Sequence, residues 1–255
     1  MDSGNISERK SGSKKRIYNR IGPFAAAFFF FFLISIQPAA TDPDEEKTNL
    51  QGSAVAEASD PFSRLSDDRI KILESAYSFL GKKTESTVSV RNESICLDCI
   101  GTVIAVYLDA GFDFRDKMSG GYDSGVRNLY AFLKENNAVY TEGLPVPGDI
   151  VFWDNTWDAD GDGDNTNDPL THAGIVIKVE ENGTVHYLHA HITRGIIIQK
   201  MNRYTPEYYS ESGEVINDAM ALGSGISRDN NPEKWTSGDL WSSYGSILDA
   251  ISNHE

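Results

Sequence analysis

The sequence is poor in positive charge, and this shortage limits the partners that the protein can have. Its 255 residues include 23 Lys or Arg against 38 Asp or Glu, which gives a formal net charge of −15. Affinity for nucleic acid comes largely from Lys and Arg side chains that neutralise phosphates. We therefore expect no nucleic-acid partner, and the acidic surface favours plain solubility.

Long apolar runs are also scarce, and the clearest one lies near the N-terminus. Residues 24–36 are almost all apolar, follow a Lys- and Arg-rich segment, and precede the small residues Ala39 and Ala40. This order is typical of a secretory signal peptide, and the run is shorter than the roughly 20 residues that span a bilayer comfortably. We predict a signal peptide over residues 1–40 and an extracytoplasmic location, either periplasmic or secreted. An uncleaved N-terminal membrane anchor is the alternative, because Pro38 makes the cleavage site imperfect.

No internal repeat is visible, so the rest of the chain divides by composition alone. Residues 41–62 are acidic, rich in Ser and Ala and without periodicity, which indicates a flexible linker. A folded domain is predicted over residues 63–226. Residues 227–255 are predicted to be a C-terminal extension that closes with an amphipathic helix from Leu240. Thr236 and the acidic residue three positions later have the spacing of a capping box for that helix.

Within the predicted domain, helical patterns come first and strand patterns follow. A first helix is capped by Ser66, presents Ile70, Leu73, Ala76, Tyr77 and Leu80 on one side, and ends at Gly81. Further apolar spacing predicts helices over residues 100–110 and 124–136. The period then changes to that of strands, over residues 150–153, 172–179, 184–191 and 195–199, with Asn182-Gly183 as a hairpin turn. Helices followed by an antiparallel sheet indicate an α+β fold.

The chain has only two cysteines, and they form a single C-x-x-C pattern at Cys96 and Cys99. Such a pair is compatible with a redox couple or disulfide, with half of a zinc site, or with one catalytic thiol and a second cysteine that has no catalytic role. Cys99 follows Asp98, a good helix cap, and opens a run that is apolar on most sides, which is typical of a buried helix. A helix start favours the thiolate. We therefore expect Cys99 to be a nucleophile with a lowered pKa.

Two histidines in the strand patterns are the expected partners of this thiol. His172 begins an apolar strand and is the candidate general base, and His189 on the next strand is the candidate that orients it. His191 shares a strand face with His189 and is its rival. Two histidines on one face and a C-x-x-C pair could instead hold zinc, so a zinc-stabilised structural domain stays open as an alternative.

Four segments in this order resemble the NlpC-type papain-like peptidases of bacterial cell walls, and the related CHAP amidases share the layout. They are Asp98-Cys99-Ile100-Gly101-Thr102-Val103, Pro147-Gly148-Asp149-Ile150-Val151-Phe152-Trp153, His172-Ala173-Gly174-Ile175-Val176-Ile177 and Leu188-His189-Ala190. The resemblance covers roughly residues 65–205. It implies a papain-like α+β fold in which N-terminal helices, with the nucleophile at a buried helix start, pack on an antiparallel sheet.

The same resemblance implies a function. An exported cysteine hydrolase would cleave amide bonds in peptidoglycan peptides through Cys99, His172 and His189, without a cofactor for catalysis. A non-catalytic module of the same fold that holds wall peptides is the alternative, and loss of thiol reactivity would favour it.

An acidic insert separates the first two predicted strands of the sheet. From Asp158 onward, every second residue as far as Asp164 is an aspartate, and the sixth residue is Gly163. The start of an EF-hand calcium loop has the same pattern. The twelfth position is Pro169 and not the usual glutamate, so Asp168 is the nearest substitute. The predicted ligands of a structural calcium ion are Asp158, Asp160, Asp162, Asp164 and Asp168. A solvated acidic loop without a metal is the alternative.

Overall fold

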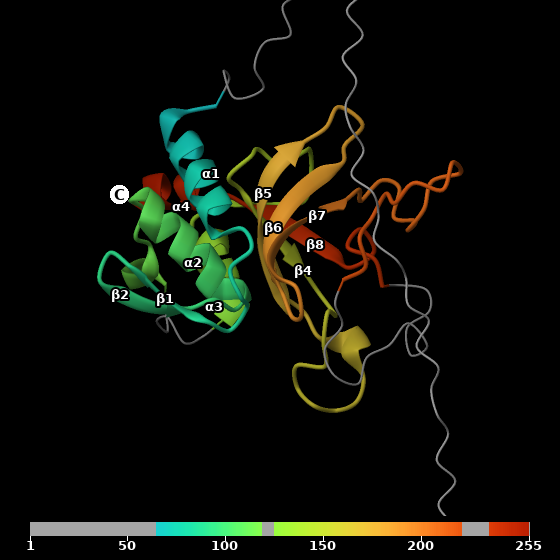
Figure 1. Ribbon diagram of the computed structural model, residues 1–255, viewed down its shortest axis with the longest axis horizontal. Coiled ribbons are helices and arrows are strands. Elements are labelled where there is room, and N and C mark those ends of the chain that lie inside the picture. Colours follow the sequence, from blue (N-terminus) through green and yellow to red (C-terminus); the bar gives the residue numbers. More distant parts are fainter. Residues whose placement is uncertain (1–64, 119–124, 221–234, 255) are drawn as a thin grey trace, which may run out of the picture. The chain divides into compact units, whose positions relative to one another are not determined.

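The computed structural model describes residues 65–118, 125–220 and 235–254. The predicted signal peptide over residues 1–40 and the predicted linker over residues 41–62 lie outside these ranges. Within them, helices combine with a two-stranded sheet and a six-stranded antiparallel sheet (Figure 1), which confirms the α+β class. No helix in this part of the chain has both the length and the apolar character needed to cross a bilayer.

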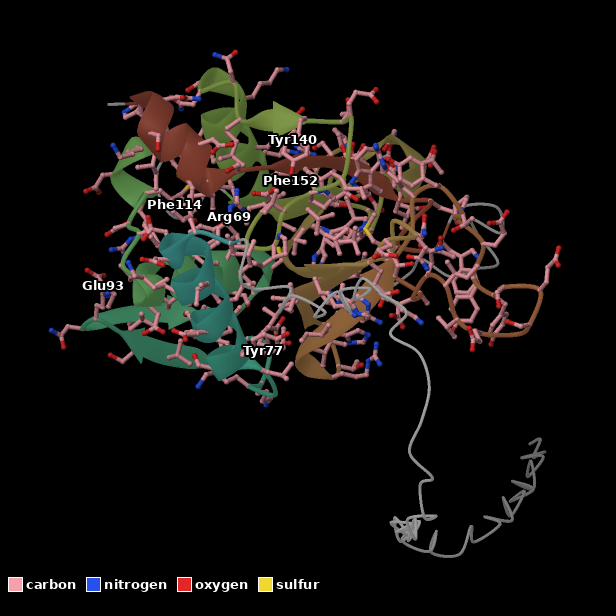
Figure 2. The ribbon with its side chains drawn as sticks, turned by 90° about the horizontal axis from the view of Figure 1, so that it is seen from above. Arg69, Tyr77, Glu93, Phe114, Tyr140 and Phe152 are labelled. Carbon is pink, nitrogen blue, oxygen red and sulfur yellow. The ribbon has the colours of Figure 1, made fainter. Side chains whose placement is uncertain are left out.

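Helix α1 (Asp67–Phe79) begins and ends as predicted, and it buries only part of the predicted apolar side, namely Leu73 and Ala76. The side chain of Ser66 accepts the backbone N–H of Arg69, and Gly81 follows the helix with a positive φ of 80°. Tyr77 and Leu80, which we expected in the core, are each 46% exposed, and Figure 2 shows Tyr77 at the surface. The buried side chains are Ile72, Leu73, Ser75, Ala76 and Phe79. The helix packs on α2 (Cys99–Ala110) and β5 (His172–Val179), and these contacts decide its orientation.

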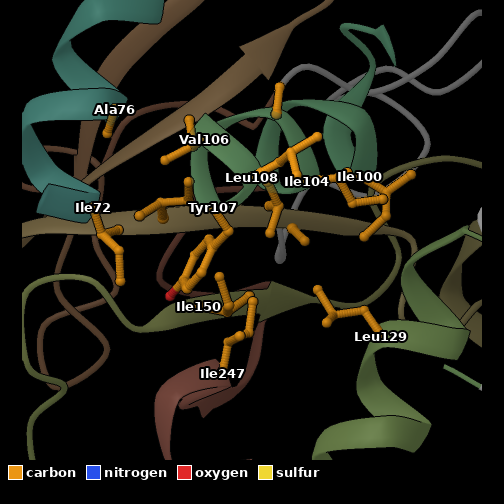
Figure 3. Close-up of a cluster of buried hydrophobic side chains, with 14 of the residues drawn as sticks. Ile72, Ala76, Ile100, Ile104, Val106, Tyr107, Leu108, Leu129, Ile150 and Ile247 are labelled. Carbon is orange, nitrogen blue, oxygen red and sulfur yellow. The ribbon is translucent and has the colours of Figure 1, made fainter. Parts of the chain in front are cut away.

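Helix α2 is the centre of the apolar core. A short hairpin, β1 (Thr87–Val90) and β2 (Glu93–Cys96), leads into it, and Gly111 ends it with a φ of 105°. Side chains from α1, α2 and α3 (Gly125–Glu135) meet there with others from the sheet and the C-terminal helix, as Figure 3 shows. Because α2 is covered on nearly all sides, its first residue is held rigidly at the edge of this core.

The six-stranded sheet has the order β3-β8-β4-β5-β6-β7, and all neighbouring strands are antiparallel. Its strands are β3 (Val139–Tyr140), β4 (Ile150–Trp153), β5, β6 (Val185–His191), β7 (Gly195–Met201) and β8 (Trp241–Gly245). The four strands predicted from the sequence are confirmed, as is the hairpin turn at Asn182-Gly183, where Gly183 has a φ of 85°. The helices cover one face of this sheet, and Met220 and Leu240 pack on the other.

The C-terminal segment differs from the sequence prediction. Residues 241–245 form β8 between β3 and β4, and the helix α4 (Ile247–His254) begins only after it. The expected capping-box bonds do form, since the Asp239 carboxylate accepts the Thr236 N–H at 3.3 Å and the Thr236 hydroxyl accepts the Asp239 N–H at 3.1 Å. They close a turn that leads into a strand. A helix from Leu240 is therefore wrong, because pairing with β4 outweighs the local signal.

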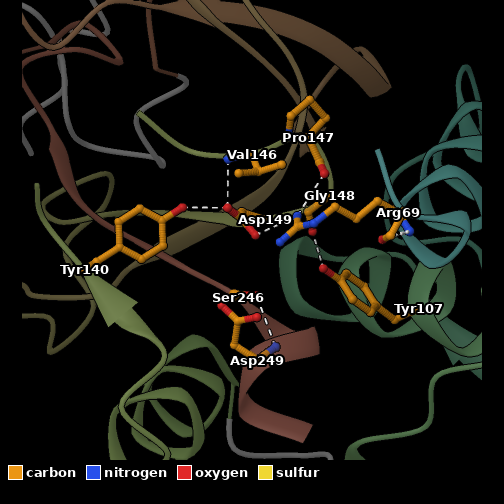
Figure 4. Close-up of polar contacts among 10 residues, drawn as sticks. Arg69, Tyr107, Tyr140, Val146, Pro147, Gly148, Asp149, Ser246 and Asp249 are labelled. Carbon is orange, nitrogen blue, oxygen red and sulfur yellow. Dashed lines mark hydrogen bonds and ion pairs between the residues drawn. The ribbon is translucent and has the colours of Figure 1, made fainter. Parts of the chain in front are cut away.

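A buried ion pair joins the helices to the start of β4. The guanidinium of Arg69 lies 2.9 Å from the carboxylate of Asp149, which is 2% exposed at its side chain. Tyr140 donates its hydroxyl to the same carboxylate at 2.5 Å, and the hydroxyl of Tyr107 donates to the carbonyl of Gly148 (Figure 4). These contacts fix the turn before β4 against α1 and α2.

Candidate active site

Cys99 is the first residue of α2, and its immediate neighbours fix it there. The carboxylate of Asp98 accepts the N–H of Gly101 at 2.7 Å, as the sequence predicted for a helix cap. The carbonyl of Asp98 also accepts the hydroxyl of Thr102 at 2.7 Å. A Cβ atom at Gly101 would lie 1.8 Å from the carbonyl oxygen of Cys96. Only glycine therefore lets the chain cross so closely over the first turn of the helix.

Three neighbouring strands supply a chain of hydrogen-bonded polar side chains. Nε2 of His172 on β5 lies 2.9 Å from Nδ1 of His189 on β6, and Nε2 of His189 lies 2.7 Å from Oε1 of Gln199 on β7. His189 and Gln199 are 1% and 5% exposed, so this chain is almost dry. The sequence predicted the two histidines and missed Gln199. A single polar residue within the otherwise apolar run at 195–199 was the available signal.

One cavity brings the three predicted catalytic residues together. It has a volume of about 400 Å³, and its lining includes Cys99, His172 and His189. A second cavity of about 290 Å³ also borders Cys99 and includes Arg127 from α3. Trp157, which is 46% exposed, lines both cavities. Cys99 therefore borders two neighbouring hollows of the surface.

Burial determines the protonation of the thiol. Desolvation, with a smaller contribution from the carboxylate of Asp98, raises the pKa of Cys99 to about 12, although backbone N–H groups, including that of Ala173, act to lower it. The prediction of a lowered pKa is therefore wrong. The favourable helix start is outweighed because the surrounding core removes the water that would solvate a thiolate.

The two histidines are neutral for the same reason. Burial lowers the pKa of His172 to about 4, with a smaller contribution from His191, and it lowers the pKa of His189 well below its usual value. The ring of Trp153 lies 5.7 Å from that of His172, and the ring of Tyr187 lies 5.2 Å from that of His189. At neutral pH the site therefore contains a thiol and two uncharged imidazoles.

The alternative residues occupy different places. Nδ1 of His191 accepts the backbone N–H groups of Thr193 and Arg194, each at 3.2 Å, and so holds the turn between β6 and β7. Cys96 is exposed at the end of β2, and both cysteines are free. Among the residues that the structure describes, the one group of three or more side chains arranged as metal ligands is acidic and includes no Cys or His.

That acidic group belongs to the insert between β4 and β5. Carboxylate oxygens of Asp158, Asp160 and Asp162 all lie within 4.8 Å of one another. Asp164 instead accepts the N–H and the hydroxyl of Thr166 at the start of a short 3₁₀ helix, η4 (Asn165–Asn167). Asp168 is buried and lies outside the group of three. The structure thus brings together three of the five predicted calcium ligands.

The base of the insert is fastened beside His172. The indole N–H of Trp157 donates to the carbonyl of Thr171 at 3.1 Å, and the hydroxyls of Thr156 and Thr171 lie 2.8 Å apart. Thr171 directly precedes His172 in the chain. A change in the conformation of the insert can therefore alter the position of His172 through Thr171.

No protein-family model matches the chain, and no curated protein is similar to it in sequence. The arrangement of Cys99, His172 and His189 is therefore the basis on which a function is inferred.

Proposed function

We propose that this protein is an exported cysteine hydrolase with a papain-like arrangement of the NlpC type, which cleaves amide bonds in peptidoglycan peptides. The observation that carries the proposal is the shared cavity of Cys99 and His172, together with the hydrogen bond between His172 and His189. A nucleophile, a base and a residue that orients the base are the parts that acyl transfer to a thiol needs.

The neutral site defines how the reaction would begin. Because the pKa of the Cys99 thiol is raised to about 12, proton transfer to His172 accompanies the attack of sulfur on the carbonyl carbon. Backbone N–H groups at the start of α2 would stabilise the oxyanion that forms. The His172 imidazolium then protonates the leaving nitrogen, the C–N bond breaks and a thioester remains. Water, deprotonated by His172, hydrolyses the thioester and restores the thiol.

The decisive test compares two cysteine variants of the full-length protein on peptidoglycan fragments, with products identified by mass spectrometry. We expect Cys99→Ala to abolish turnover and Cys96→Ala to retain most of it. Equal loss from both variants would contradict the proposal and indicate a role shared by the two thiols. Binding of fragments without any product, together with an unreactive Cys99, would identify the non-catalytic wall-peptide module.

We also propose a structural calcium ion in the insert, with no cofactor in the catalytic steps themselves. The support is the approach of three carboxylates within 4.8 Å, since oxygen ligands at this density repel one another without a cation. Asp158, Asp160 and Asp162 would be its main ligands.

Export, the remaining part of the proposal, rests on residues 1–40. N-terminal sequencing of the protein from its native host should show a mature chain that begins after Ala40. If the apolar run at 24–36 is retained in a membrane fraction, the protein is an anchored enzyme and the signal peptide is not cleaved.

The acidic net charge of −15 supports the absence of a nucleic-acid partner.

A further inference from the structure

We infer that Gln199 is a positioning residue, which sets the tautomer of His189 and through it the tautomer of His172. The inference rests on the proposed function, because it explains how His172 is kept ready to accept a proton. It starts from the two hydrogen bonds that join the three side chains, of 2.9 Å and 2.7 Å.

A neutral imidazole carries one proton on its two nitrogens, so each ring both donates and accepts. Burial keeps His172 and His189 uncharged at neutral pH. The 2.9 Å contact between Nε2 of His172 and Nδ1 of His189 therefore contains a single hydrogen, which belongs to one ring or the other. The contact itself does not decide which ring donates.

The far end of the chain makes the choice. Nε2 of His189 faces Oε1 of Gln199, and an amide oxygen only accepts. His189 must then carry its proton on Nε2, which leaves Nδ1 as an acceptor. His172 donates to that acceptor from its own Nε2. Nδ1 of His172 is thus left with a free electron pair, which is what a base for Cys99 needs.

The opposite arrangement would disable the site. If the amide nitrogen of Gln199 faced His189, it would donate to Nε2 of His189. His189 would then carry its proton on Nδ1 and donate it to Nε2 of His172. The proton of His172 would therefore lie on Nδ1. A neutral His172 in that tautomer could not accept the Cys99 proton. Because His189 and Gln199 are 1% and 5% exposed, water offers little competition for these bonds. The amide orientation therefore controls whether His172 acts as a base.

The sheet register explains why Gln199 is the residue in this position. Gln199 pairs with Tyr187, two residues before His189, so the two side chains are diagonal neighbours on the same face of β6 and β7. A longer or shorter side chain at 199 would not place an acceptor at the same point.

The tautomers can be measured directly in the full-length protein labelled with ¹⁵N-histidine. Long-range ¹H–¹⁵N spectra at pH 7 should show both His172 and His189 protonated at Nε2. Gln199→Met keeps the length of the side chain and removes the acceptor, so the Nε2–H form of His189 should lose its dominance. Lys200→Met, on the neighbouring residue of β7, is the matched control and should leave both signals unchanged.

Activity across pH separates positioning from mere support of the fold. Gln199→Met should lower kcat/KM on the order of 10²-fold or more, chiefly in kcat, because a base in the wrong tautomer cannot act. Gln199→Glu keeps an acceptor oxygen and should restore most of the rate. Its negative charge raises the pKa of both histidines, so the acid limb of the pH profile should move to higher pH.

Two outcomes would overturn the inference. One is a wild-type spectrum in which His172 carries its proton on Nδ1, and the other is a Gln199→Met protein with unchanged tautomers and unchanged rate. A wild-type protein that has both Nε2–H tautomers and no hydrolytic activity would overturn the proposed function alone and would support the role of Gln199.

Discussion

The two halves of the candidate site are built in different ways. Cys99 is fixed by residues within three positions of it, through the cap at Asp98 and the close crossing at Gly101. His172 and His189 are 17 residues apart, and only the pairing of β5 with β6 brings them to hydrogen-bond distance. The thiol half thus depends on local geometry, and the histidine half depends on sheet register and burial.

Within the histidine half, the largest expected effect comes from removing the base. His172→Ala should lower kcat/KM by roughly 10²–10⁴-fold, the usual contribution of general acid–base catalysis. His189→Ala should lose less, because it acts only through His172. Steady-state kinetics on a peptidoglycan peptide would measure both effects. His191→Ala is the control, and a loss larger than that of His189→Ala would show that the residues have been assigned the wrong roles.

This division also explains how much the sequence could predict. The helix cap at Asp98 and the strand patterns that carry His172 and His189 are local signals, and the structure places all three predicted catalytic residues around one cavity. The contact of Gln199 with His189 and the place of β8 between β3 and β4 depend on strand pairing between distant residues, which no local pattern encodes. The register of a sheet is decided by the whole core.

The raised pKa of Cys99 is a second property that local sequence signals do not predict. The helix start that should favour the thiolate is visible in the sequence, whereas the burial that opposes it comes from elements spread over the whole domain. Local charge and helix position can therefore be predicted from the sequence. Desolvation at a given atom requires the fold.

The burial of the histidines should make folding sensitive to acid. The pKa of His172 is about 4 in the folded protein and about 6.5 in an unfolded chain. Between these values the unfolded state binds a proton that the folded state does not, so stability falls as the pH drops from about 6.5 to about 4. His172 alone should contribute about 3 kcal/mol to this loss, and His189 acts in the same direction.

Urea denaturation at pH 7, 5.5 and 4 would measure this effect. His172→Gln should make the dependence on pH weaker, because it removes the buried imidazole whose pKa differs between the folded and unfolded states. An equal dependence in the wild type and His172→Gln would refute the role of His172 burial.

A smaller effect is expected from crowding the thiol half. Gly101→Ala places a Cβ atom where the carbonyl oxygen of Cys96 lies, at 1.8 Å, so the turn before α2 must move. Overpacking of this kind typically costs about 1–3 kcal/mol of stability. Because the moved turn carries Asp98 and Cys99, the reaction of Cys99 with a thiol probe should slow even where the protein remains folded. Unchanged labelling kinetics in a folded Gly101→Ala protein would show that the crossing does not position the thiol.

The smallest effect should come from the insert, which touches the histidine half only through Thr171. Calcium at Asp158, Asp160 and Asp162 would stabilise the folded state by mass action, by about 1 kcal/mol in 1 mM calcium if the Kd is about 0.1–1 mM. For a domain of this size, such a gain raises the Tm by about 2–4 °C. Melting curves with calcium and with chelator would measure it, and Asp160→Ala combined with Asp162→Ala should abolish the difference. Because Trp157 and Thr156 bond to Thr171 beside His172, kcat should rise with calcium as well. An unchanged Tm in the wild-type protein would mean that the insert is a solvated acidic loop.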